Sequence, residues 1–176
     1  MKKILILCLL FVTGCMNPPQ KTFQIDPDNE TYVFNVASVE PVPMTGIFDS
    51  AQHIEHKMPT APEDAVIKWT INHLKATGQG KEKMFVIIHR AEMIQEDKPN
   101  PNLFQFDEET YTLTYRLEIQ HRTQEQIIKS VPVEGKGFIT LNKKASLNAK
   151  EKGWAWLIQK MLAHLKNKIQ TDFNNV

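Results

Sequence analysis

Residues 111–120, YTLTYRLEIQ, alternate apolar and polar side chains more regularly than any other part of the chain. Successive side chains of a strand point to opposite faces of a sheet, so Tyr111, Leu113 and Leu117 share one face. The threonines and charged residues between them share the other face. The pattern predicts a strand with one face in the core and one in water. The sheet that contains it is therefore expected to have other elements packed on its apolar face.

Three more segments are predicted as strands from their β-branched and aromatic content. They span Thr31–Val39, Met84–Ile88 and Ile127–Leu141. The first is expected to end at Pro41 and Pro43. The second is a continuous apolar run, which is typical of a central strand covered on both faces, and it is expected to continue toward Met93. The third contains Pro132 and Gly135, which favour an edge position or a bulge.

Two amphipathic helices complete the pattern. The first opens at Thr60 or Ala61, with Pro62 in its first turn, and is expected to end between Lys75 and Gly78. The second is capped by Ser146, and its apolar residues recur at helical spacing: Trp154, Leu157, Ile158, Met161, Leu165, Ile169 and Phe173. The order β-α-β-β-β-α predicts an α+β fold, in which two helices cover one face of a four-stranded, mainly antiparallel sheet.

The first fifteen residues have the features of an export signal. Lys2 and Lys3 precede the apolar run Ile4–Val12, which is too short to span a bilayer. The end of this segment, Val12-Thr13-Gly14-Cys15, resembles the bacterial lipobox. That resemblance implies that Cys15 carries a diacylglycerol and an N-acyl chain, which would be the only non-protein groups. An ordinary signal peptide with a cysteine nearby, or an uncleaved anchor, is the alternative.

The expected organisation is a signal peptide at 1–14, a lipidated cysteine and flexible tether at 15–30, and one periplasmic domain at 31–176. Cys8 is lost with the leader and Cys15 is acylated, so no disulfide or cysteine metal site is expected. Acidic and basic residues are nearly balanced, which argues against a nucleic-acid partner. Met16 is not the aspartate that commonly retains lipoproteins in the inner membrane, so the resemblance favours outer-membrane localisation.

Few residues are grouped in a way that suggests chemistry. His53 and His56 are the one clustered pair of metal-capable side chains, and they could serve a metal-dependent enzyme or contact a partner. No third ligand follows from the spacing, and there is no serine-hydrolase elbow or phosphate-binding glycine loop. The acidic run Asp107-Glu108-Glu109 is expected to be solvated. We therefore expect neither catalysis nor a bound metal.

The last helix is rich in lysine, and Lys160, Lys166 and Lys168 could contact lipid phosphates or a partner. Two helical positions subtend about 200°, so Trp154 and Trp156 point in nearly opposite directions. Trp154 is expected in the core, which leaves Trp156 as a candidate contact residue. The alternative is a soluble helix with a lysine-rich exterior.

The segment from His53 to Trp69, followed by Leu74-Lys-Ala-Thr-Gly78, resembles an uncharacterised family of small alphaproteobacterial lipoproteins. The architecture is similar to auxiliary lipoproteins of ABC-type envelope transporters and to the lipoprotein that plugs the lipopolysaccharide-inserting barrel. These resemblances imply a non-catalytic accessory or scaffold lipoprotein in envelope assembly or lipid transport. Its partners would be membrane lipid through Cys15 and an envelope protein complex. A lipid- or lipopolysaccharide-binding module that uses the basic C-terminal helix is the alternative.

Overall fold

The computed structural model describes residues 25, 29–46, 51–99 and 107–173. In chain order its elements are β1 (Tyr32–Phe34), β2 (Ser38–Pro43), the 3-10 helix η1 (Glu55–Lys57), α1 (Pro62–His73), β3 (Leu74–Ala76), β4 (Lys83–Lys98), β5 (Glu108–Arg122), β6 (Ile127–Asn142) and α2 (Leu147–Asp172). The alternating residues 111–120 form the middle of β5.

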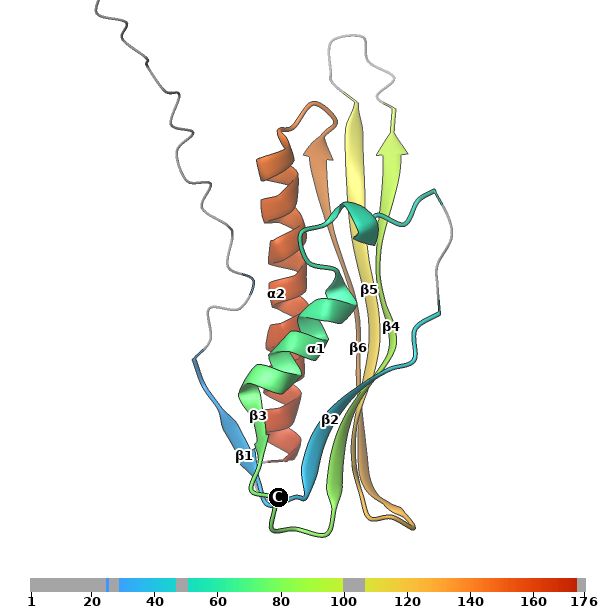
Figure 1. Cartoon of the computed structure of the whole chain (residues 1–176). Helices are drawn as coiled ribbons and strands as arrows, with labels where there is room; N and C mark the ends of the chain where they lie inside the picture. Colours follow the sequence, from blue (N-terminus) through green and yellow to red (C-terminus); the bar gives the residue numbers. More distant parts are fainter. Residues whose placement is uncertain (1–24, 26–28, 47–50, 100–106, 174–176) are drawn as a thin grey trace, which may run out of the picture.

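The main sheet has four strands in the order β2-β4-β5-β6. β2 runs parallel to β4, and the other two pairs are antiparallel. Both helices lie on the same face of this sheet, α1 over β2 and β4 and α2 over β5 and β6 (Figure 1). The predicted α+β class, the four-stranded mainly antiparallel sheet and the shared helix face are confirmed.

The core lies between the helices and the inner face of the sheet. Leu113, Leu117 and Ile119 of β5 are buried there, together with Leu157 and Met161 of α2. Each such side chain contributes about 1.5–3 kcal/mol when it is removed from water. Ser146 caps α2 as predicted, because its Oγ accepts a hydrogen bond from the Ala149 N–H.

The first strand is not the single unit expected over Thr31–Val39. The chain bends after Phe34, so β1 pairs with β3 in a separate two-stranded sheet, while β2 joins the main sheet. The expected end is confirmed at Pro43, the last residue of β2, but not at Pro41, which lies within the strand. A missing N–H is tolerated there because β2 is an edge strand, which pairs with β4 alone among the described strands of the main sheet.

The first helix ends earlier than expected. α1 stops at His73, and Leu74 begins β3, where it pairs with Tyr32. Leu74 has the spacing of an apolar residue of the helix. Its burial and its backbone pairing with β1 nevertheless place it in a strand. Gly78, expected at the helix end, adopts a positive φ of 75° in the following turn, a conformation that glycine accepts without strain.

The strand predicted from Met84–Ile88 is central, as expected, and extends to Lys98. It is not covered on both faces: Met84 and Ile88 are buried, whereas Phe85 and Ile87 are only half-buried. The reason is that both helices pack on one face. The predicted edge position of the segment from Ile127 is confirmed, since β6 pairs with β5 alone among the described strands.

Candidate functional site

The site residues proposed from the sequence fall in separate places. Cys15, the proposed lipid attachment point, lies outside the described residues. His53 and His56 belong to the connection between β2 and α1. Trp156, Lys160, Lys166 and Lys168 are on α2. The two groups do not form one pocket.

The segment around His53 docks on the edge of β4 beyond the end of β2. His53 bridges to Ile94, and the Ile54 N–H donates to the Met93 carbonyl at 3.1 Å. Ile54 is fully buried. Glu55 then turns back, and its Oε1 accepts the Met93 N–H at 2.6 Å. His53 Nδ1 lies 3.4 Å from the same oxygen. His53 and Glu55 thus hold the connection against the sheet.

His56 does not join His53. It is exposed in η1, and it belongs to no group of three or more metal-capable side chains among the described residues. The other histidines bond elsewhere: His89 to Glu118, His121 to Glu82, His164 to Tyr115, and His73 to the Glu30 carbonyl. Across the described ranges, no three His, Cys, Asp or Glu side chains are placed to hold a metal ion.

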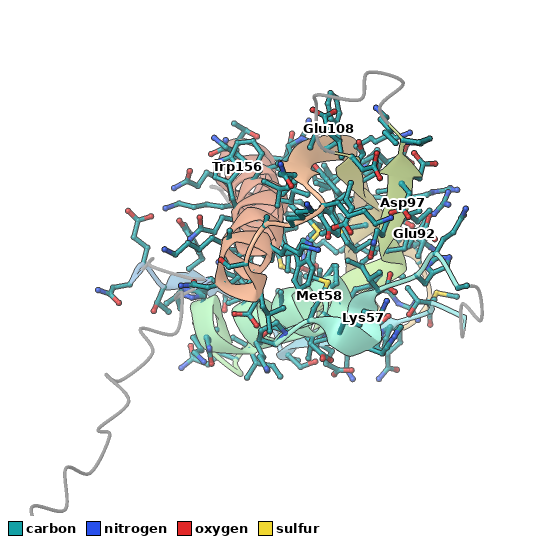
Figure 2. The ribbon with its side chains drawn as sticks, turned by 90° about the horizontal axis from the view of Figure 1, so that it is seen from above. Lys57, Met58, Glu92, Asp97, Glu108 and Trp156 are labelled. Atoms are coloured by element: carbon teal, nitrogen blue, oxygen red, sulfur yellow. The ribbon has the colours of Figure 1, made fainter. Side chains whose placement is uncertain are left out.

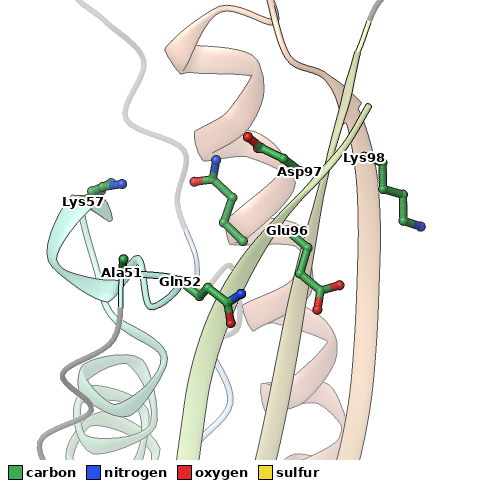
Figure 3. A pocket seen from close by; sticks show the side chains of 7 residues that line it. Ala51, Gln52, Lys57, Glu96, Asp97 and Lys98 are labelled. Atoms are coloured by element: carbon green, nitrogen blue, oxygen red, sulfur yellow. The ribbon is translucent and has the colours of Figure 1, made fainter. Parts of the chain in front are cut away.

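An open polar cleft of about 560 Å³ lies beside the docked segment. Figure 3 shows Lys57 on one side of it and Glu96, Asp97 and Lys98 of β4 on the other. Asp97 also bonds Lys143 at 2.7 Å, and this hydrogen bond lowers the pKa of the Asp97 carboxyl. The mixed charges and the open shape suit a solvated surface better than a binding site for one small molecule.

A buried polar group near the start of α2 was not anticipated. Glu109 was expected to be solvated, but it is 4% exposed. Its Oε2 accepts from Lys150 Nζ at 2.6 Å and from the Tyr111 hydroxyl at 2.5 Å. Burial, together with the Glu109 hydrogen bond, raises the pKa of Tyr111. The ring of Tyr111 also meets Trp154 edge-on at 5.5 Å. This group fixes α2 on β5.

Trp156 lies on the side of α2 opposite the buried stripe of that helix, which includes Trp154, Ile158 and Leu165 (Figure 2). It is 46% exposed, whereas Trp154 is 4% exposed, as the helical spacing predicted. Lys160 Nζ lies 5.5 Å from the centre of the Trp156 ring, a cation–π contact. No helix in the described ranges is long and apolar enough to cross a membrane.

Lys166 and Lys168 do not lie beside Trp156 as Lys160 does. Lys166 Nζ bonds the Glu30 carboxylate at 2.8 Å, so it ties the start of the domain to α2. Lys168 is half-buried and lies about 120° around the helix from Trp156. The same Glu30 carboxylate accepts from the Tyr32 hydroxyl at 2.6 Å. We call Glu30, Tyr32, His73 and Lys166 the Glu30 clamp.

No family model and no curated protein matches the sequence, so the resemblance to the alphaproteobacterial family stays a prediction. Solved structures do match. A minor lipoprotein from Acinetobacter baumannii aligns with a TM-score of 0.46 and 9% identity, over 77% of this chain and 92% of that one. Rare lipoprotein B from Shewanella oneidensis aligns with a TM-score of 0.37 and 10% identity, over 78% and 97%.

Proposed function

We propose that the protein is a lipid-anchored accessory lipoprotein of the bacterial cell envelope, with its domain facing the periplasm. Cys15 carries the acyl chains that hold it in the outer membrane, and two or more chains hold a protein stably. The domain acts as a scaffold in envelope assembly or lipid transport and does not catalyse a reaction. The leader residues Lys2 to Cys15 support the anchor.

The observation that carries the scaffold role is the outer face of the main sheet, which the helices leave uncovered. Phe138 of β6 pairs with Thr112 of β5, a polar-face residue, and is 65% exposed. Phe85 and Ile87 of β4 add half-buried apolar area to the same face. An exposed aromatic side chain among polar neighbours is typical of a protein contact surface.

Several polar residues of this face are already paired with one another. Arg116 bonds Glu134 across β5 and β6 at 3.2 Å. Glu118 accepts hydrogen bonds from Ser130 at 2.6 Å and Gln120 at 2.7 Å. A face whose polar groups satisfy each other loses little on contact with a partner, since few buried groups are left without hydrogen bonds. This supports a binding role rather than a chemical one.

The test is co-purification of the tagged, lipidated protein from detergent-solubilised membranes. We expect an envelope transporter or barrel subunit to be recovered with the natural chain. The Phe138→Glu variant should lose that subunit, because it replaces the most exposed aromatic side chain of the proposed contact with a charge. Recovery of only the monomer with the natural chain would count against the proposal.

Ile71→Glu is the matched control. Ile71 is also a large exposed apolar residue, 54% exposed, but it lies on α1, on the other side of the sheet. The control should recover the same subunit as the natural chain. Equal loss of the subunit in both variants would mean that the outer face of the sheet is not the contact.

A further inference from the structure

The exposed side of α2 combines one aromatic side chain with positive charge. Lys152 and Lys160 stand four residues before and after Trp156, so all three lie within about 40° of one line along the helix. All three are exposed, and Lys160 packs over the Trp156 ring. The result is a short ridge, which we call the Trp156 ridge, with an indole between two ammonium groups.

The acidic residues of α2 lie away from this ridge. Glu151 and Asp172 are about 140° and 160° around the helix from Trp156, and both are half-buried. The ridge is therefore cationic without neighbouring carboxylates from its own helix. It complements a surface of negative charge.

The chain enters the domain on the same side of α2. The Glu30 clamp joins the entering segment to Lys166 at 2.8 Å, and the Gln170 amide donates to the Tyr32 hydroxyl at 3.1 Å. On the helix, Lys166 and Gln170 lie about 80° and 40° from Trp156. Lys166 is ten positions from Trp156, which is about 15 Å along the axis at 1.5 Å per residue.

The distance from this entry point to the lipid has an upper bound. Residues 16–29 separate Cys15 from Glu30. Fully extended, such a segment spans at most roughly 50 Å at about 3.4 Å per residue. The Trp156 ridge therefore lies within reach of the bilayer that holds an acylated Cys15.

We propose that the Trp156 ridge lies on the anionic surface of the membrane that holds the lipid of Cys15. The proposal rests on the anchor proposed above. The Trp156 indole sits at the headgroup level, where tryptophan is enriched because its ring is apolar and its N–H is polar. Lys152 and Lys160 meet the lipid phosphates. The bound surface is the membrane itself rather than a protein.

This orientation also fits the sheet. Because α2 packs on the inner face of β5 and β6, the Trp156 ridge and the outer face of the sheet are separate surfaces (Figure 1). Phe138, on the outer face, stays exposed for a protein partner. Membrane contact and partner contact use separate surfaces of the domain.

The test uses the complete lipidated protein in vesicles of phosphatidylcholine alone or with phosphatidylglycerol, each containing lipid brominated near the headgroup. Trp69 and Trp154 are 3% and 4% exposed, so bromine should quench Trp156 selectively. The fluorescence that is lost in the Trp156→Phe variant gives the contribution of Trp156 to the total emission. We expect quenching in the anionic vesicles and little in the neutral ones. Lys152→Glu with Lys160→Glu should abolish it, since each lysine changes the docked fraction about fivefold.

Lys68→Glu with Lys136→Glu is the matched control, because it changes the net charge equally at exposed positions on α1 and β6. Quenching of Trp156 should persist in this control variant. Flotation of the vesicles separates the two proposals. A chain that does not float with neutral vesicles refutes the anchor, and with it the docking. A chain that floats without Trp156 quenching in anionic vesicles, or that loses quenching equally in both lysine pairs, refutes the docking alone.

Discussion

Glu118 should make the stability of the domain depend on pH in the acid range. The hydrogen bonds from Ser130, Gln120 and His89 lower its pKa from 4.5 to about 2. The folded state therefore keeps this carboxylate charged at pH values where the unfolded chain protonates it. The stabilisation is complete above about pH 5 and is lost as the pH falls from about 4.5 through about 2.

The magnitude follows from the pKa and the exposure. A change from 4.5 to about 2 corresponds to at most about 3.5 kcal/mol, at about 1.4 kcal/mol per pH unit. The Glu118 side chain is 24% exposed, so solvent screening reduces this to about 1–2 kcal/mol. Glu118→Gln keeps an oxygen that Ser130 and Gln120 can bond but removes the charge. We expect the variant to be less stable by that amount at pH 7.

The assay is urea unfolding followed by tryptophan fluorescence at several pH values between 7 and 2. Other carboxyl groups titrate in both proteins, so the difference in unfolding free energy between the natural chain and Glu118→Gln isolates this group. The difference should shrink as the pH falls and vanish near pH 2. A difference that stays constant over this range, or grows in acid, would refute the reasoning.

The remaining predictions concern packing and capping, and each is checked by the urea midpoint at neutral pH. Gly80→Ala should destabilise by about 1–3 kcal/mol, because its Cβ would overlap the Asn35 carbonyl, whereas Gly46→Ala, which meets nothing within 4 Å, should have no comparable effect. Ser146→Ala should cost about 1 kcal/mol through loss of the α2 cap, and an unchanged midpoint would contradict the cap. Ile54→Ala should cost about 2–5 kcal/mol, and a smaller loss would mean that the docked segment contributes little to the core.

The sequence was sufficient for the features that depend on local periodicity. The alternation over residues 111–120 predicted β5, and the spacing from Trp154 to Phe173 predicted the buried face of α2. Both patterns are local, because burial of one face selects residues at a period of two in a strand and 3.6 in a helix. The same spacing separated exposed Trp156 from buried Trp154.

The sequence was less informative about the candidate site. It pointed to Trp156 and Lys160, which the structure places together on one side of α2. It grouped Lys166 and Lys168 with them, and here the structure differs. Lys166 bonds Glu30, which lies far away in the chain, and Lys168 is half-buried. The lysines of a helix predict that it carries positive charge. They do not predict which residues of distant segments bond each lysine.

Contacts between distant segments decided the rest. Pro41 and Pro43 remain in a strand because β2 is an edge strand among the described strands of the main sheet. Leu74 leaves the helix because β1 offers it a backbone partner. Glu109 is buried because Lys150, which lies 41 positions later, reaches it with a charge-assisted hydrogen bond. By itself the sequence determined which faces of its strands and helices are apolar, since that is a local property. Only the tertiary structure decided which polar and backbone groups meet, because those partners come together only when the chain folds.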